Sequence, residues 1–356
     1  MTSNSRMSGG VTIGLDLGDR RSAMCVLDEG GEVVARMKPA TTESALLAAV
    51  KRYPGARVVM EVGTQSPWVS RLFERNGYDV VVANPWRVRQ IAGQQDKSDP
   101  IDAELLARLG RVDPALLRPI KHRGEQAQSD RALLRVRDGL VRSRSAMVTQ
   151  ARCIAKSLGK RLPRCDAHNF AKRLDRAAPE LRAAFPGLET LLGAVADVTR
   201  RIEALDKEIE RVCRDRYPET ARLRQIPGVG PITAMAYVLT IEEPTRFERS
   251  RCVGAYLGLR PKRYQSGASD PELGISKGGD PYVRRMLVQS AHYILGHFGR
   301  DTALRRFGER LMKRGGRAAR KRAAVAVARK LAVVLHRLWV TGERYEPLRG
   351  VTIAAA

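Results

Sequence analysis

Residues 11–39, VTIGLDLGDRRSAMCVLDEGGEVVARMKP, decide the fold class of this chain. Short apolar runs alternate in this stretch with turns rich in Gly, Asp and Arg, a pattern typical of consecutive β-strands. Three strands are therefore expected, over residues 11–18, 22–28 and 31–39.

Downstream, the pattern changes to alternating helices and strands. The apolar runs ARVVMEVG (56–63) and DVVVANP (79–85) predict two further strands, and helices are expected over 44–52 and 67–76. Three consecutive strands followed by this alternation predict a mixed sheet covered by helical layers. The fold class is therefore α/β at the N-terminus, followed by a mainly helical remainder.

Positive charge is concentrated away from the α/β region. The 356 residues include 64 Lys and Arg against 38 Asp and Glu, a formal net charge of +26. Residues 1–105 are neutral, with 13 basic and 13 acidic residues, whereas residues 106–356 carry 51 and 25. Such an excess most often serves a polyanion through counterion release from phosphates, and a merely cationic surface is the alternative. The neutral third must have a task other than electrostatic capture.

Several classes of protein are disfavoured by composition. With 43% hydrophobic residues the chain can bury a core. It has no uncharged apolar stretch of about 18 residues and no apolar signal-peptide core, so no membrane partner is expected. Its five cysteines lack a C-x-x-C pair and its five histidines lack an H-x-x-x-H pair. These features predict a cytoplasmic protein in which any catalytic metal is held mostly by oxygen ligands.

The middle of the chain is expected to be helical and elongated. One series of apolar residues recurs there at alternating spacings of three and four, which is typical of a coiled coil. It consists of Leu188, Leu191, Val195, Val198, Ile202, Leu205, Ile209 and Val212. A second series, Leu133, Leu140, Met147 and Ile154, has a strict seven-residue spacing. The seam could lie inside a helical hairpin or between subunits, and we favour an oligomer contact.

Two C-terminal features suit phosphate binding. LRQIPGVGPITAMAYVLT (223–240) places Gly228 and Gly230 between two apolar helical stretches, like a helix-hairpin-helix, although an ordinary tight turn is the alternative. Residues 313–330 contain eight basic residues and no acid. We expect a phosphate-facing surface, with a solvated helix face as the alternative. Its candidates are Lys313, Arg314, Arg317, Arg320, Lys321 and Arg322.

Four carboxylates in the neutral region form the candidate catalytic site. Asp16 and Glu61 each end a predicted strand, and Asp99 and Asp102 are three residues apart at a predicted helix start. Each acid alone is common in a turn or at a strand end. Converging, the four would hold two Mg²⁺ or Mn²⁺ ions, which activate a nucleophile and stabilise the leaving oxygen in phosphodiester cleavage.

The order D…E…D-x-x-D resembles the RuvC-like domain of the ribonuclease H fold. Together with GAYLGLRPKRYQSGASDPELGISKGGDPYVRRML (254–287), it is similar to the DEDD-type insertion-sequence transposases, prokaryotic recombinases guided by a structured bridge RNA. The resemblance implies a RuvC-like metal-binding catalytic domain over 1–110 and a helical coiled-coil domain over 111–217. It also implies a transposase domain over 218–356 that carries a nucleophilic serine.

The same resemblance implies roles for individual residues. Asp16, Glu61, Asp99 and Asp102 correspond to the metal-binding acids, and Ser266 in YQSG corresponds to the nucleophile. Gln265 stands where the family often has a second hydroxyl residue, and Ser269 and Ser276 lie nearby. A serine needs a base or a metal for activation, and without the resemblance Ser266 is best interpreted as a turn residue. Basic residues around it are expected to hold the scissile phosphates, with a solvated surface as the alternative: Lys262, Arg263, Lys277, Arg284 and Arg285.

The expected function is therefore that of a DNA recombinase of a mobile element. It would cut a strand, hold it as a phosphoserine ester and rejoin it without a nucleotide cofactor. The resemblance implies donor and target double-stranded DNA, a bridge RNA and a homo-oligomer, dimer or tetramer, at the nucleoid. Aromatic residues are only 5% of the chain, so backbone and shape recognition is expected to dominate over base stacking. A metal-dependent nuclease or junction resolvase that uses water is one alternative, and a non-catalytic nucleic-acid-binding protein is another.

Overall fold

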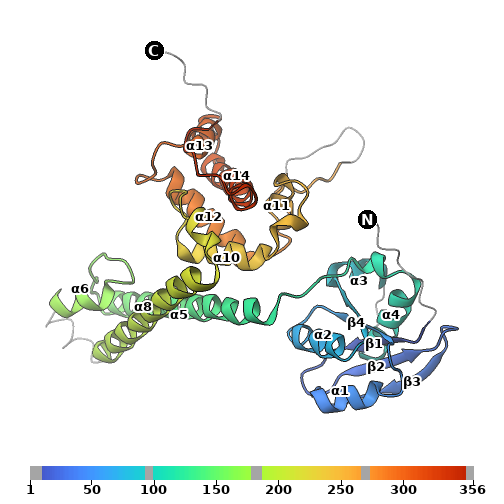
Figure 1. Ribbon diagram of the computed structural model, residues 1–356. Coiled ribbons are helices and arrows are strands. Elements are labelled where there is room, and N and C mark those ends of the chain that lie inside the picture. The colour runs from blue at the N-terminus through green and yellow to red at the C-terminus, as the bar shows by residue number, and fades with distance from the viewer. Residues whose placement is uncertain (1–9, 93–98, 178–186, 266–272, 350–356) are drawn as a thin grey trace. The chain divides into compact units, whose positions relative to one another are not determined.

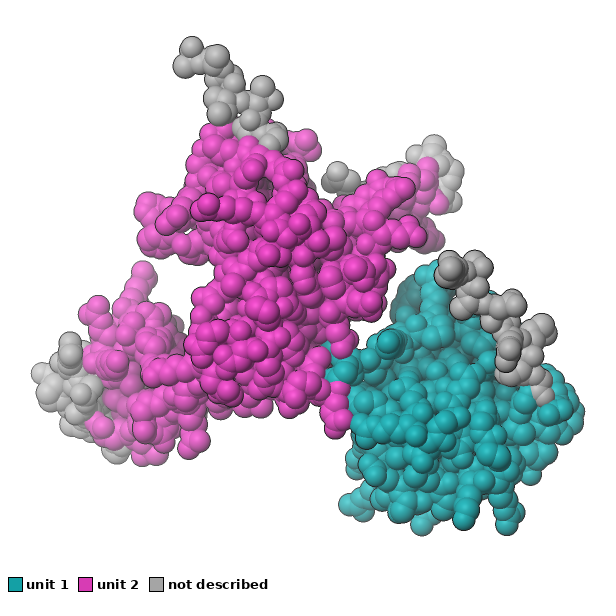
Figure 2. All heavy atoms as spheres, viewed as in Figure 1, with its two compact units in different colours: residues 1–124 teal, residues 125–356 magenta. Residues whose placement is uncertain are grey.

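The computed structural model describes residues 10–92, 99–177, 187–265 and 273–349 (Figure 1). The chain forms two compact units, residues 1–124 and residues 125–356, which Figure 2 colours separately. The first is built on a sheet and the second is mostly helical, as the sequence predicts. The division into three domains stays a prediction.

Unit 1 contains a five-stranded mixed sheet in the order β3-β2-β1-β4-β5. The three N-terminal strands form an antiparallel meander, whereas β4 and β5 pair in parallel with β1 and with each other. All five predicted strands and both predicted helices are confirmed. The elements are β1 (Thr12–Asp16), β2 (Ala23–Leu27), β3 (Val33–Met37), α1 (Glu43–Val50), β4 (Arg57–Glu61), α2 (Ser66–Arg75), β5 (Asp79–Ala83), α3 (Pro85–Ala92), α4 (Asp99–Val112) and η1 (Pro114–Leu117).

Strand periodicity sorts the side chains of the sheet onto two faces. Ile13, Leu15, Val58 and Met60 belong to one apolar cluster together with residues of α1 and α2. The intervening positions of the strands point to the opposite face, where Val59 clusters with residues of α3, α4 and η1. The sheet is therefore covered by helices on both faces, and neighbouring residues of one strand contact different layers.

Unit 2 is helical throughout its described elements. A core runs through α10, α12 and α14, where the hydroxyl of the fully buried Tyr237 donates to the Ala332 carbonyl at 2.7 Å. In the described part of the chain, no helix is both long and apolar enough to cross a membrane. The elements are α5 (Glu125–Ser157), α6 (Phe170–Ala177), α8 (Leu188–Arg216), α9 (Glu219–Leu223), α10 (Pro231–Ile241), η2 (Pro244–Arg246), α11 (Arg251–Tyr256), α12 (Pro281–Leu295), α13 (Ala303–Lys313) and α14 (Ala319–Thr341).

The predicted seam closes an antiparallel hairpin between α5 and α8 (Figure 1). Arg137 binds Asp206, and Arg144 donates to Thr199 Oγ1 at 3.3 Å, which sets the register of the two helices. Five of the eight predicted seam positions of α8 are buried: Leu188, Val195, Ile202, Ile209 and Val212. At the other three the prediction was wrong: Leu191, Val198 and Leu205 are only half-buried, and Leu192, Thr199 and Cys213 are buried in addition. An apolar stripe therefore remains beside the closed seam.

Candidate functional site

The first two candidate acids end two adjacent parallel strands. Asp16 is the last residue of β1 and Glu61 is the last residue of β4, so both lie at the carboxyl edge of the sheet. Asp16 follows Gly14 by two positions and Glu61 follows Val59 by two. Because strand side chains alternate, the two carboxylates are directed to the face that packs against α4.

Helix α4 runs antiparallel to these strands. Near its middle, a methyl group at Gly14 would come within 2.5 Å of the Ala107 nitrogen, so helix and strand are in backbone contact. Near its end, the carbonyl of Gly110 accepts from Arg57 Nη1 at 3.2 Å, and Arg57 is the first residue of β4. The C-terminal end of the helix therefore lies over the start of the strands, and its N-terminus lies over their carboxyl edge.

This direction brings the other two acids to the same edge. Asp99 and Asp102 form the first turn of α4, where the helix dipole favours negative charge. A cation is present beside them, because Lys38 Nζ lies 3.9 Å from Asp99 Oδ2; both side chains are more than half exposed. Lys38 follows β3 directly, and it was missed because no motif marks it. The four predicted acids thus share one edge of one sheet.

The donor set suits a hard divalent cation. Four carboxylates offer only oxygen ligands, which Mg²⁺ and Mn²⁺ prefer, and soft sulfur ligands are absent from the set. In the described ranges, however, no three His, Cys, Asp or Glu side chains are gathered closely enough to form a metal-binding group. The shared edge therefore supplies suitable donors, but not a completed coordination shell.

A buried hydrogen-bond network anchors the loop after Glu61. Ser66 Oγ donates to the Gly63 carbonyl at 2.9 Å and accepts from the Gly63 N–H at 3.0 Å. His122 Nε2 hydrogen-bonds the same oxygen at 2.8 Å, and it is the donor in the tautomer that leaves the hydroxyl proton with Gly63. Burial, reinforced by Arg71 and Arg123, lowers the pKa of His122. The 56-residue separation of Ser66 and His122 hides this contact from local sequence patterns.

The second candidate region surrounds Ser266, which itself lies outside the described residues, as does Ser269. The backbone on either side is paired: Lys262 N–H donates to the Gly274 carbonyl, Ser276 N–H to Arg260 and Lys277 N–H to Gly258, at 2.9–3.1 Å. The segment carrying Ser266 is thus closed at its base by a short ladder. Lys262, Arg263 and Lys277 are exposed around this base.

Two of the predicted phosphate-binding residues are engaged within the protein. Arg284 Nη1 donates to the carbonyls of Leu257 and Gly278 at 3.1 and 2.7 Å, and burial lowers its pKa. Arg285 donates to Asp138 of α5 at 2.6 Å. Arg284 therefore braces the base of the segment and Arg285 ties α12 to α5, uses that their sequence positions do not reveal.

The remaining phosphate-binding candidates lie at turns. Gly228 has φ +89° and Gly230 caps α10, so the predicted glycine turn lies between the five-residue α9 and α10. A dense basic cluster surrounds the turn between α13 and α14. All of its members are exposed, and no acidic residue of the described chain lies within ion-pair distance of them. The members are Lys313, Arg314, Arg317, Arg320, Lys321 and Arg322.

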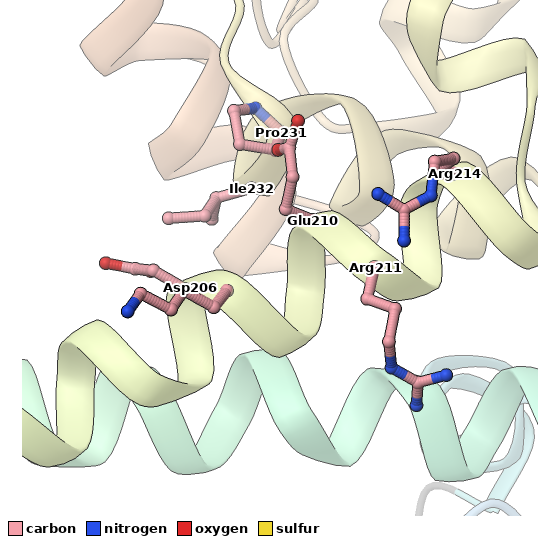
Figure 3. Close-up of a pocket in the computed structure, with 7 residues that line it drawn as sticks. Asp206, Glu210, Arg211, Arg214, Pro231 and Ile232 are labelled. Carbon is pink, nitrogen blue, oxygen red and sulfur yellow. The ribbon is translucent and has the colours of Figure 1, made fainter.

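A cavity of about 580 Å³ lies between α8 and the start of α10 (Figure 3). Its charged lining is mixed: Arg211 donates to Glu208 at 2.6 Å, and Arg214 donates to Asp215 at 3.1 Å. Because these cations already have acidic partners, the cavity is a poor anion site. The lining residues are Asp206, Lys207, Glu210, Arg211, Arg214, Pro231 and Ile232.

Comparison with known proteins relates both regions to transposases. Residues 13–158, which include all four acids, match the family model of DEDD transposases of the IS110 type. Residues 220–307 match the model of the transposase IS116/IS110/IS902 family.

Individual relatives extend over most of the chain. The chain is 32% identical to the transposase for insertion sequence element IS1328 of Yersinia enterocolitica, over 80% of this chain and 83% of that protein. It is 29% identical to the transposase for insertion sequence element IS1111A of Coxiella burnetii, over 94% and 90%. A shorter match, 29% identical over 32% of this chain and 34% of the relative, is to the pilin gene-inverting protein of Moraxella bovis.

Proposed function

Since the chain belongs to the DEDD-type insertion-sequence transposases of the IS116/IS110/IS902 family and is thus a DNA transposase, we propose that it cuts and rejoins DNA through a serine ester. Four carboxylates and Ser266 carry the reaction in this proposal. The observation that supports it best is the antiparallel course of α4, which brings Asp99 and Asp102 to the strand ends that carry Asp16 and Glu61.

The acidic site belongs to a RuvC-like, ribonuclease H-type domain in this proposal. The mixed five-stranded sheet with helices on both faces supports it. DEDD-type domains are generally dependent on divalent metals, and here Asp16, Glu61, Asp99 and Asp102 would hold two Mg²⁺ or Mn²⁺ ions. When bound, such ions lower the pKa of an attacking hydroxyl and neutralise charge on the leaving oxygen.

The serine step conserves the energy of the phosphodiester bond. The Oγ of Ser266 loses its proton and forms a bond to phosphorus, while the bond from phosphorus to one deoxyribose oxygen breaks and that oxygen takes up a proton. A DNA hydroxyl then attacks the phosphoserine and releases the serine. Because the number of phosphate esters is unchanged, rejoining needs no nucleotide cofactor.

Recognition of nucleic acid is assigned to unit 2. The exposed α13–α14 cluster supports contacts with phosphates of donor and target duplexes, since its six cations have no acidic partner among the described residues. A structured bridge RNA would supply the sequence information by base pairing. Lys262, Arg263 and Lys277, at the base of the Ser266 segment, would contact the strand being cut.

We assign oligomerisation to the half-buried stripe of the hairpin. The register of the hairpin places Leu140 within about one helical turn of Leu205 and Met147 within one turn of Val198, all of them partly exposed. Charge also favours a second copy, because α5 has seven basic and three acidic residues whereas α8 has six and seven. An arrangement that sets α5 of one copy against α8 of another would pair these charges.

A covalent adduct tests the mechanism. Purified protein with its co-expressed element RNA would be mixed with end-labelled donor and target DNA and Mg²⁺, and products would be separated on a denaturing gel with and without protease. We expect a protease-sensitive adduct for the wild type and none for Ser266→Ala or Asp99→Ala. Asp19→Ala, which removes an exposed acid of unit 1 outside the predicted set, is the matched control for Asp99, and Ser276→Ala is the control for Ser266.

The same gel distinguishes the serine mechanism from the two alternative functions. Cleavage that persists in Ser266→Ala without an adduct would replace the serine mechanism with a water-attacking nuclease or junction resolvase. DNA binding without any Mg²⁺-dependent cleavage would instead indicate a non-catalytic nucleic-acid-binding protein.

A further inference from the structure

An exposed group of rings lies at the end of α12 and in the turn that follows it. Phe298 is 77% exposed and Tyr293 is 48% exposed, although aromatic residues are rare in this chain. The ring of His297 contacts that of Phe298 edge-on, with centroids 5.3 Å apart. Large apolar side chains exposed together mark interaction sites more often than single ones do.

The turn holds Phe298 on a fixed backbone. Arg305 Nη1 donates to three carbonyls of the turn, those of Ile294, Gly296 and Gly299, at 3.1, 2.7 and 2.9 Å. Glu309 in turn accepts from Arg305 Nε at 2.8 Å. These bonds hold the backbone on both sides of Phe298, whose side chain is presented to solvent.

The surroundings of Phe298 suit a polyanion. His292, His297 and Arg300 are exposed beside it, and the acid next in sequence, Asp301, is already bound by Arg306 through contacts of 2.6–3.2 Å. The local charge that remains for a ligand is therefore positive. This combination of an exposed ring with a flanking arginine and hydrogen-bonding imidazoles is typical of surfaces that stack a nucleobase and contact its phosphates.

The predicted glycine turn lies against the same group. A methyl group at Gly228 would come within 2.8 Å of the Tyr293 ring and 3.2 Å of the Ser290 carbonyl, so the turn before α10 rests directly on the last turns of α12. Figure 1 shows α10 and α12 side by side. The exposed rings and a turn suited to phosphate contact therefore share one surface of unit 2.

From these observations we propose that Phe298 stacks on an unstacked base of a DNA strand. This inference rests on the proposed function, because it presumes that unit 2 binds DNA. It adds a local contact to the backbone recognition described above: cations hold the strand, and the ring stabilises a base that has left the helical stack. Every base has a flat face, so the contact would recognise distorted DNA and not a particular sequence.

The test compares an intact duplex with one that contains 2-aminopurine opposite an abasic site, in which the fluorescent base is unpaired and therefore costs less to unstack. Full-length wild type is expected to bind the distorted duplex more tightly and to quench its fluorescence on contact. Phe298→Ala should weaken binding to the distorted duplex by about 5- to 150-fold and leave intact-duplex affinity within about twofold. Phe298→Trp should retain the preference, whereas Phe298→Leu, which keeps bulk without an aromatic face, should lose most of it.

Val340→Ala, which removes a half-exposed apolar side chain of α14, is the control for surface apolarity and should behave as wild type. Equal binding of both duplexes by wild type and Phe298→Ala would overturn the inference alone. A wild type that binds neither duplex would overturn the proposed function as well. An effect of Phe298→Ala confined to an RNA hairpin with an unpaired loop base would reassign the contact to RNA and overturn the DNA proposal.

Discussion

Gly14→Ala is expected to displace α4 and to separate two of the four carboxylates from the other two. The added methyl group would come within 2.5 Å of the Ala107 nitrogen and closer still to the Ala103 carbonyl oxygen, whereas ordinary contacts begin at 3.4 Å. Both obstacles are backbone atoms, so no side-chain rotation relieves them. The helix must retreat by roughly 1 Å, a misplacement that can cost about 100-fold in rate when catalytic groups depend on it. Overpacking of this kind should also lower the free energy of unfolding by about 1–3 kcal/mol.

The measurement is Mg²⁺-dependent strand cleavage over a metal titration, together with denaturant unfolding. We expect Gly14→Ala to need more metal and to cleave more slowly even at saturation. Gly63→Ala, in the loop after Glu61, is the matched control, because a methyl group there meets no atom within 4 Å. Normal cleavage and normal unfolding of Gly14→Ala would refute the close packing of α4 on β1, and with it the argument that assembles the acidic edge.

Three further predictions concern other parts of the fold. Burial lowers the folded-state pKa of His122, so this residue stabilises the fold above its unfolded pKa of about 6.5 and the contribution is lost as pH falls. Unfolding curves between pH 7 and 5 should show this loss. His122→Gln, whose amide can still donate to Ser66, should make the free energy of unfolding depend less on pH over this range. Leu140→Glu should reduce the oligomer mass in sedimentation, whereas Thr149→Glu, at an exposed polar position of α5, should not; unchanged mass in both would remove the stripe from the interface. Asp130→Ala should lower the free energy of unfolding by about 1–3 kcal/mol, because it removes a buried carboxylate that accepts hydrogen bonds from Arg216 and Tyr217; a denaturation midpoint equal to that of the wild type would contradict this.

The α/β part of the fold was predictable because its determinants are local. Each strand of unit 1 is a compact apolar run, and the acids at the ends of β1 and β4 interrupt such runs at one point. A spacing of three residues from Asp99 to Asp102 suffices to place both in one helical turn. That all four acids lie at the same edge of the sheet follows only from the direction of α4, whose close approach to the strands requires Gly14 in β1 and Gly110 in the helix.

Other features depend on contacts between distant residues, which periodicity does not encode. The alternation of three- and four-residue spacings predicts a seam, but the partner helix decides which neighbouring positions are buried, so Leu191 is half-exposed where Leu192 is covered. The charge of Arg284 suggests phosphate binding, whereas its geometry commits it to two carbonyls. Composition correctly shows that aromatic residues are scarce, but not that two of them, Tyr293 and Phe298, are exposed close together beside His297.

The alternation of side chains along β1 has a consequence for judging copies of such elements in genomes. In-frame loss of the single codon between Gly14 and Asp16 would leave all four acids present in their order. It would nevertheless rotate the carboxylate of β1 to the opposite face of the sheet, among the apolar residues beneath α1 and α2. A genome survey that only checks for the four motif acids would score that copy as intact, although its acidic site would be incomplete and we expect no transposition. Strand register, and not the presence of the acids alone, is therefore the criterion that distinguishes an active copy from an inactive one.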